Sequence, residues 1–327
     1  MSVSRRFLMQ TAAAVVAAVT LPARSAFAQN YPQRPVKIIV PYAAGGASDI
    51  IARLIAQHLE RELGQPFIVD NRAGGASMVG TQAVATAVPN GDIIGVIDSA
   101  FVINPGLFGA KLPYDTTRDF APISLLVTSP LLLVVHPSVA ANSVKELVDL
   151  AKAQPGKINF ASAGLGTAIH LAGEQFRQAA DIEISHIPYR GGAPSITDLL
   201  AGQVQMTFST VPTILQHVKS GKVRALGVTG QRIVQLPDLP TMAEAGLPAV
   251  DASPLFGIVA PAGLPQDIVA KLSETSAAGI KNDPLRGRAT ELGFVAVGST
   301  PGEFRSRIGD EIAKWSRIIE KGNIKPG

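Results

Sequence analysis

Residues 36–49, VKIIVPYAAGGASD, decide the fold of this chain of 327 residues. The run at 36–40 is rich in β-branched residues, which predicts a short strand covered on both faces. Gly45 and Gly46 follow, and glycine lets the backbone turn sharply and approach a ligand closely. The stretch therefore predicts a buried strand that ends in a glycine-rich turn.

A helix is predicted directly after this turn, through IIARLIAQHLEREL at 50–63. Ser48 is predicted as its N-cap, and Asp49 suits the positive end of the helix dipole. Gly64 is expected to stop the helix. Because a helix N-terminus presents free backbone N–H groups, this order of strand, turn and helix predicts a site for a phosphate or a carboxylate.

The next segments repeat the order of strand, turn and helix. We expect strands at 67–70 and 93–97 and a helix at 78–87. The short connections between them predict a parallel sheet, in which ligands sit beyond the carboxyl ends of the strands. The loops at 43–49, 71–77 and 98–101 then converge on one edge of the sheet, which makes Ser99 a candidate ligand contact.

A second α/β unit is predicted in the middle of the chain. Residues 105–122 are predicted to be a loop, followed by strands at 123–127, 131–135, 158–161, 184–187, 204–208 and 223–229 with helices between them. A strand at 256–260 and helices at 265–278, 283–292 and 301–321 are expected to complete the first unit. The fold class is therefore α/β with two domains, domain 1 at 29–127 and 253–327 and domain 2 at 128–252. Two domains joined by two crossings form a cleft that can close by a hinge.

The first 28 residues predict a secretory signal peptide. They contain Arg5 and Arg6, an apolar run too short to span a bilayer, and an A-x-A cleavage site at 26–28. Both the general secretion (Sec) route and the twin-arginine route fit this segment. The segment carries three arginines, including Arg24, and no acidic residue, so its removal lowers the formal net charge from +4 to +1. The mature chain is expected to be soluble and exported.

Composition and motifs exclude several classes of function. The small mature charge gives no support for nucleic-acid binding. The chain has no cysteine, so disulfides, thiol catalysis and thiolate metal sites are impossible. The histidines do not have metal-ligand spacing, and the sequence has no G-x-S-x-G, H-E-x-x-H, Walker A or complete dinucleotide-binding motif. We therefore predict no catalytic residue, no metal and no cofactor.

Six long motifs resemble the substrate-binding proteins of tripartite tricarboxylate transporters, also called the Bug family. They are YPQRPVKIIVPYAAGGASDIIARLIAQHL, GQPFIVDNRAGG, FASAGLGTAIHLAGEQF, HIPYRGGAPSITDLLAGQVQMTF, LPDLPTMAEAGLP and APAGLP, in this order from residue 31 onward. The resemblance implies a type II periplasmic binding-protein (Venus flytrap) fold. It also implies a small carboxylate ligand, a periplasmic location, and delivery to the large and small membrane subunits of such a transporter.

The resemblance also implies ligand contacts on loops of both domains. From the first domain these are Ala44, Gly45, Gly46, Ser48, Asp49, Asn71 and Gly74, and from the second Ser162, Gly164, Gly166, Thr167, His170, Tyr189 and Gly191. For two of these residues a structural role competes with ligand contact. Asp49 could shape the site without direct contact, because a carboxylate repels an anion, and His170 could brace its loop from the domain interior.

Two other functions remain open at this point. The chain could be an exported α/β hydrolase acting on a carboxylate ester, for which Ser162 or Thr167 with His170 is the available set of groups. It could also be a ligand sensor without a transport role. The sequence does not choose among dicarboxylates, tricarboxylates, aromatic carboxylates and acidic amino acids, and a monomer is the default expectation.

Overall fold

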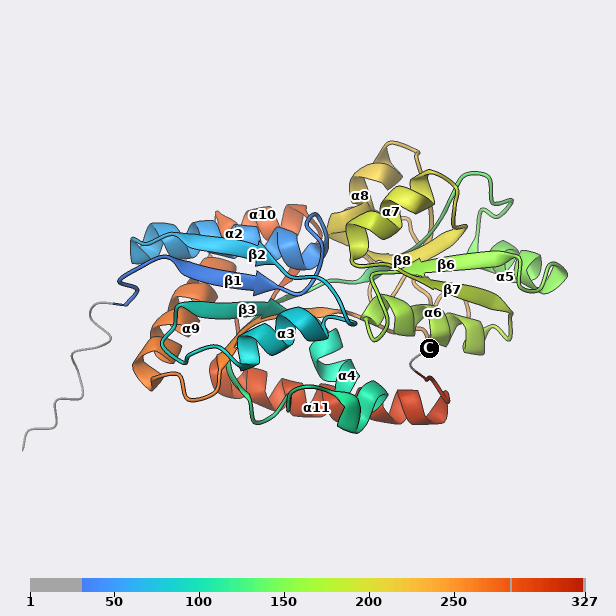
Figure 1. Cartoon of the computed structure of the whole chain (residues 1–327). Coiled ribbons are helices and arrows are strands. Elements are labelled where there is room, and N and C mark those ends of the chain that lie inside the picture. The colour runs from blue at the N-terminus through green and yellow to red at the C-terminus, as the bar shows by residue number, and fades with distance from the viewer. Residues whose placement is uncertain (1–30, 283, 326–327) are drawn as a thin grey trace, which may run out of the picture. The chain divides into compact units, whose positions relative to one another are not determined.

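Two β-sheets organise the chain (Figure 1). The computed structural model describes residues 31–282 and 284–325, so the predicted signal peptide lies outside the described residues. From Pro32 onward the chain forms one compact unit that holds both sheets. In this part of the chain, no helix has the length and apolar character needed to cross a membrane.

The first sheet has six strands in the order β11-β4-β10-β3-β1-β2. Its strands are β1 (Val36–Val40), β2 (Phe67–Asn71), β3 (Ile93–Ile97), β4 (Phe120–Thr128), β10 (Leu255–Pro261) and β11 (Val295–Ala296). Its helices are α2 (Ala47–Leu63), α3 (Met78–Ala85), α4 (Ala100–Phe108), α9 (Gln266–Lys281), α10 (Leu285–Glu291) and α11 (Pro301–Lys321). Strand β1 pairs in parallel with both β2 and β3, which confirms the parallel arrangement predicted for the opening segments. Strands β4, β10 and β11 pair antiparallel, so the whole sheet is mixed.

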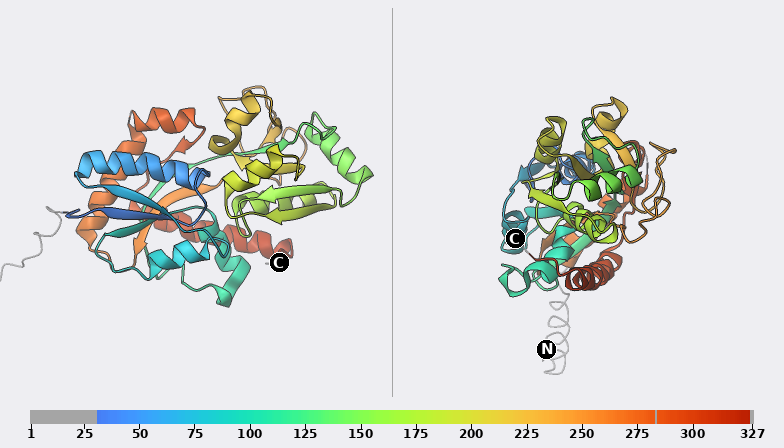
Figure 2. Two further views of the ribbon diagram at one scale, coloured as in Figure 1. Left: turned by 45° about the horizontal axis from the view of Figure 1, so that its top comes forward. Right: turned by 90° about the vertical axis from the view of Figure 1, so that its right-hand side faces the viewer.

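The second sheet has five strands in the order β7-β6-β8-β5-β9. Its strands are β5 (Leu131–Val135), β6 (Ile158–Ser162), β7 (Ile184–Pro188), β8 (Met206–Thr210) and β9 (Arg224–Val228). Its helices are α5 (Val144–Ala153), α6 (Ala168–Ala179), α7 (Gly192–Leu200) and α8 (Val211–Lys219). Figure 2 shows helices on both faces of each sheet, which is the layered arrangement of α/β folds.

The chain passes from the first sheet to the second between β4 and β5, and it returns between β9 and β10. The sequence predicts crossings between domains at residues 127–128 and 252–253. The exact boundaries, 29–127, 128–252 and 253–327, stay a prediction. With two passages and helices on both faces of two sheets, the chain has the α/β architecture expected from the sequence.

The opening strand and helix form as their residues predict. All of β1 except Lys37 is buried, and helix α2 buries an apolar stripe that includes Ile51, Ile55 and Leu59. Gly64 ends this helix with a φ of 74°, a conformation that glycine adopts without steric cost. At the other end of the chain, Trp315 is buried in the core, and its Nε1–H donates to Glu311.

The predicted N-cap of α2 is wrong. Helix α2 begins at Ala47 with Gly46 as its N-cap, so Ser48 lies inside the first turn. Gly45 has a φ of 88°, which reverses the chain early and leaves Gly46 in the extended conformation of a cap. The carbonyl of Gly46 then accepts the N–H of Ile50 at 2.9 Å.

The predicted loop at 105–122 is also wrong, because α4 continues through Pro105 to Phe108 and is followed by a 3₁₀ turn at Gly109–Lys111. Proline removes one hydrogen bond from a helix interior. Here the burial of apolar residues compensates, since Phe101 is buried and packs edge-on against Phe120 at 4.8 Å between ring centroids. Strand β8 begins two residues later than predicted.

Candidate functional site

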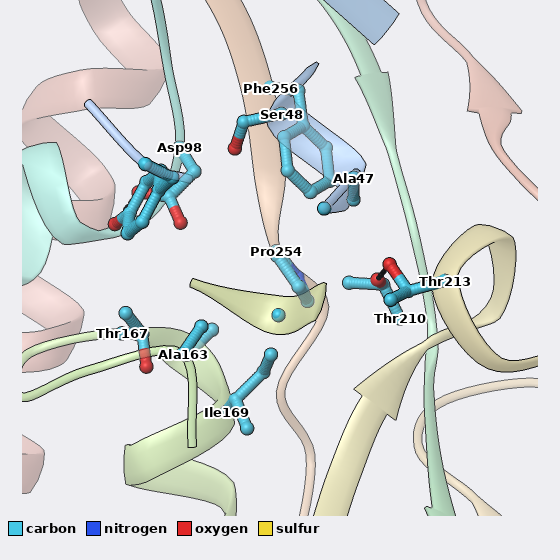
Figure 3. A pocket seen from close by; sticks show the side chains of 14 residues that line it. Ala47, Ser48, Asp98, Ala163, Thr167, Ile169, Thr210, Thr213, Pro254 and Phe256 are labelled. Carbon is cyan, nitrogen blue, oxygen red and sulfur yellow. Dashed lines mark hydrogen bonds between the residues drawn. The ribbon is translucent and has the colours of Figure 1, made fainter. Parts of the chain in front are cut away.

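A small pocket lies between the two sheets, and Figure 3 shows the side chains around it. Its lining residues are Tyr42, Gly46, Ala47, Ser48, Asp98, Ala163, Thr167, Ala168, Ile169, Gly192, Thr210, Thr213, Pro254 and Phe256. Several of them lie at or within two residues of the carboxyl ends of strands β1, β3, β6 and β8, the position predicted for ligands in parallel sheets. The cavity is narrow, about 30 Å³.

The N-termini of four helices meet at this pocket. Helix α2 contributes Gly46 to Ser48, and α6 contributes Thr167 to Ile169. Helices α7 and α8 each place their first turn at the same pocket, through Gly192 and Thr213. The first N–H groups of a helix have no partner within the helix, and they carry the positive end of its dipole. The pocket is therefore suited to an anion, although none of the described residues that line it is a lysine or an arginine.

Asp49 braces the first loop from behind the pocket. Its Oδ2 accepts the N–H of Gly45 at 2.9 Å and Nε of Arg53 at 3.0 Å, while its Oδ1 accepts Nδ2 of Asn71 at 3.0 Å. Burial alone would raise the pKa of Asp49, but the hydrogen bonds from Arg53, Gly45 and Asn71 outweigh it and lower the pKa. The Asp49 carboxylate therefore accepts hydrogen bonds from the loop and its neighbours, and Asn71, the last residue of β2, also donates to the carbonyl of Tyr42 and so ties the loop to β2.

The second loop is held by the N-cap of α6. The Thr167 hydroxyl donates to the carbonyl of Gly164 at 2.7 Å and accepts the N–H of His170. Gly164 and Gly166 have φ values of 133° and 70°, in the region that favours glycine. These bonds fix the turn that carries Thr167 and Ala168 into the pocket.

Two stacked histidines lie beneath this loop. The rings of His170 and His186 are 4.2 Å apart between centroids, and Nε2 of His186 is 2.6 Å from the Ser162 hydroxyl. Burial lowers the pKa of His170 to about 4, and burial together with the neighbouring His170 lowers that of His186 to about 3. The Ser162 hydroxyl donates to the carbonyl of Gly164 and accepts its N–H, so Ser162 and the histidine pair support the loop from inside.

Tyr42 and Asp98 form one side of the pocket as a hydrogen-bonded carboxyl–phenol pair. Neither residue was predicted from the sequence as a ligand contact. The Tyr42 hydroxyl donates to Oδ1 of Asp98 at 2.8 Å, and the N–H of Ala100 donates to the same oxygen at 2.9 Å. Burial raises the pKa of Asp98 to about 6, and burial and the neighbouring Asp98 raise that of Tyr42 well above 10. The sequence feature that could have identified Asp98 is its position directly after the buried strand β3.

Two threonines on the opposite side were also missed. The hydroxyls of Thr210 and Thr213 are 2.8 Å apart, and Figure 3 shows the pair facing Asp98 across the pocket. Thr210 ends β8 and Thr213 lies in the first turn of α8. The sequence pattern predicts β8 two residues too early. Thr210 was therefore not recognised as the residue at the end of this strand.

The predicted site residues fall into three groups. Gly46, Ser48 and Thr167 line the pocket. Gly74, Gly164 and Tyr189 line a neighbouring recess that shares Tyr42 and Ala163 with it. The remaining predicted residues, which do not line the pocket, are Ala44, Gly45, Asp49, Asn71, Ser99, Ser162, Gly166, His170 and Gly191.

Some of the remaining residues hold the two halves together around the pocket. The N–H of Ala43 donates to the carbonyl of Arg190 at 3.1 Å, beside Gly191. A Cβ on Gly166 would lie 2.2 Å from Oδ1 of Asn104, a buried residue of α4. Ser99, in contrast, makes its contact within the first half, where it is buried and accepts the N–H of Leu255 from β10. Within residues 31–282 and 284–325, no group of three or more His, Asp or Glu side chains could hold a metal ion.

Comparison with known proteins shows which family this chain resembles. The family model of the tripartite tricarboxylate transporter family receptor matches residues 51–324. Protein BugT of Bordetella pertussis is 35% identical over 305 residues, which cover 91% of this chain and 92% of BugT.

Two solved structures have closely similar folds. Rpa4515 of R. palustris, solved with adipate, is 32% identical with a TM-score of 0.88, covering 91% of this chain and 100% of its own. The periplasmic binding protein BugD is 33% identical with a TM-score of 0.87, covering 90% of this chain and 99% of its own.

Proposed function

The chain belongs to the tripartite tricarboxylate transporter receptor family, and we propose that it captures a small carboxylate in the pocket between its two sheets. The observation that carries the proposal is the meeting of four helix N-termini at one pocket. Rpa4515, a relative of the same fold, was solved with a dicarboxylate, which supports the same class of ligand here. Proteins of this family are binding receptors and not enzymes.

Capture needs no chemical step. The backbone N–H groups at the starts of α2, α6 and α7, with the hydroxyls of Ser48 and Thr167, would hold the carboxylate. Closure of the two halves removes the anion from water, which strengthens each of these bonds. Gly74, Gly164 and Tyr189 in the neighbouring recess would contact the part of a longer ligand that extends from the pocket. Asp49, Asn71 and the histidine pair would keep the loops in place.

The side chains that a hydrolase would need for catalysis already form hydrogen bonds with other groups of the protein. The Ser162 hydroxyl is fully buried and bonded to Gly164 and His186, and the Thr167 hydroxyl donates to a carbonyl. The Nδ1 of His170 accepts the N–H of Gly166 at 3.4 Å, so this ring faces the loop backbone. A serine nucleophile must instead donate its proton to a general base.

We further propose a periplasmic location, export through the segment at 1–28, and delivery of the ligand to the large and small membrane subunits of a transporter by a monomeric receptor. BugD, of the same fold, is a periplasmic binding protein. A sensor without a transport role would bind the same ligand in the same way. Reconstituted membrane subunits distinguish the two: a transport receptor binds them when loaded, and a sensor does not.

A thermal-shift screen tests carboxylate capture. The protein from residue 29 onward is melted alone and with a panel of mono-, di- and tricarboxylates, aromatic carboxylates and amino acids, with the matched amides as controls. A ligand at a hundred times its dissociation constant stabilises the folded state by about 2.7 kcal/mol. For domains of this size that raises the melting temperature by roughly 5–10 °C.

We expect one group of related carboxylates to give this shift, the amides to give none, and the ligand to be recovered unchanged. The absence of a shift with every carboxylate would contradict the proposal. A ligand recovered in altered form would contradict the receptor assignment and favour the hydrolase.

A further inference from the structure

One side of the pocket presents hydrogen-bond acceptors, whereas the helix N-termini present donors. Two donors to Asp98 from other residues, the Tyr42 hydroxyl and the N–H of Ala100, reach Oδ1. Oδ2 is therefore the carboxylate oxygen left for a ligand. The Tyr42 hydroxyl donates its proton to Asp98 and is also hydrogen-bonded by the Ser77 side chain, so one lone pair of its oxygen remains to accept from a ligand. Both residues line the pocket.

This side of the pocket would repel a ligand that carries only negative charge. A second carboxylate beside Asp98 would place two like charges in one narrow cavity, and each would disfavour the charged form of the other. None of the described lining residues is a lysine or an arginine that could neutralise Asp98. A ligand that carries its own cation would remove this repulsion.

We propose that the natural ligand is an amino carboxylate, whose ammonium group lies between Asp98 and Tyr42 while its carboxylate meets the starts of α2 and α6. This inference rests on the proposed carboxylate capture and narrows it. An ammonium group offers three donors, which match Oδ2 of Asp98 and the Tyr42 oxygen, and it forms a charge-assisted bond with the carboxylate. Asp98 is thus the residue that selects among carboxylates.

The size of the pocket is consistent with a compact ligand. The cavity of about 30 Å³ has room for about two water molecules, so the halves must separate to admit a ligand, and a compact ligand needs the smallest separation. A zwitterion with both charges close together uses such a space efficiently. The recess beside Tyr42 and Ala163 is the direction in which a side chain of the ligand would extend.

The test compares matched pairs of ligands that differ only in the amino group. Dissociation constants are measured by calorimetry for aspartate and succinate, glutamate and glutarate, and alanine and propionate. In the wild type we expect the best amino member to bind more tightly than its partner by about tenfold or more. In Asp98→Asn this preference falls to within about twofold, because the neutral amide no longer attracts the ammonium group.

Asp92→Asn is the matched control, since Asp92 precedes the same strand at its opposite end and pairs with Arg34 on the surface. It should bind all ligands as the wild type does. If the wild type prefers the ligands without an amino group, the inference of an amino carboxylate is overturned and carboxylate capture stands. This comparison uses the wild type alone, so it does not depend on the folding of any variant. A preference that survives Asp98→Asn would also overturn it. If neither member of any pair binds, and the wider panel of carboxylates fails as well, the proposed function itself fails.

Discussion

The histidine pair beneath the β6–α6 loop makes the protein sensitive to acid. His170 and His186 are stacked, and their pKa values of about 4 and about 3 lie below the usual 6.5. Between these values and pH 6.5 the unfolded chain binds more protons than the folded one. The free energy of unfolding therefore falls as the pH falls through this range. At pH 5 each histidine removes about 2 kcal/mol relative to neutral pH.

A variant isolates this effect. His186→Gln keeps a donor for Ser162 but does not titrate, so its free energy of unfolding should fall less between pH 7 and pH 5 than that of the wild type. Urea unfolding at both pH values measures the difference. The comparison between the two proteins matters, because the raised pKa of Asp98 acts in the opposite direction near pH 4–6. Equal losses in variant and wild type would show that His186 does not titrate as the structure indicates.

At the scale of single elements, the N-cap of α6 links folding to ligand capture. The hydroxyl of Thr167 caps α6 and holds the carbonyl of Gly164. Thr167→Val should lower the free energy of unfolding by about 1–2 kcal/mol, the usual effect of losing a cap. It should also weaken ligand binding by about tenfold or more, because the loop that carries the backbone donors of α6 loosens.

Thr300→Val is the matched control, since Thr300 caps α11 through a capping box and does not line the pocket. We expect a similar loss of stability from it and unchanged binding. Denaturant unfolding and calorimetry on both variants separate the two effects. Binding that falls equally in both variants, or in neither, would contradict the role of Thr167 at the site.

Local signals explain which elements the sequence predicts well. Strand β1, the turn at Gly45 and helix α2 follow from residues adjacent in the chain, and the same is true of the β6–α6 unit around Thr167. Helix α4 was missed because Pro105 indicates a break, and only its packing against Phe120, supplied by β4, shows why the helix persists.

The site was predictable only in part, for a similar reason. The sequence indicates that the loop at 98–101 reaches the pocket, yet it does not show which residue faces it. Ser99 turns to the N–H of Leu255, whereas Asp98 meets Tyr42 in the pocket. That choice depends on strand β10, which lies more than 150 residues away in the chain. Contacts of this kind have no local signature.

At the scale of the whole molecule, Gly166 and Asn104 set how closely the two halves approach. Gly166 has a φ of 70°, and a Cβ there would lie 2.2 Å from Oδ1 of Asn104. Gly166→Ala should therefore keep the halves apart and weaken ligand binding by about tenfold or more, because only the closed pocket surrounds the ligand. Removing the obstacle with Asn104→Ala in the same chain should restore part of the affinity.

Gly156→Ala provides the matched control. Gly156 also has a φ of 70°, but a Cβ there would meet no atom within 4 Å. Both alanine variants carry the backbone cost of the left-handed conformation, about 1–2 kcal/mol, and only Gly166→Ala should lose affinity in a calorimetric titration. Equal affinities in the two variants would contradict a closing contact at Gly166.

The central claim is that helix N-termini between the two sheets bind a carboxylate. Its most direct test is a calorimetric titration of the protein from residue 29 onward with the best carboxylate of the thermal-shift screen and with the amide of the same molecule. We expect one site per chain for the acid and binding at least a hundredfold weaker for the amide, because the amide lacks the charge that the helix dipoles stabilise. An amide that binds as tightly as its acid would contradict the account.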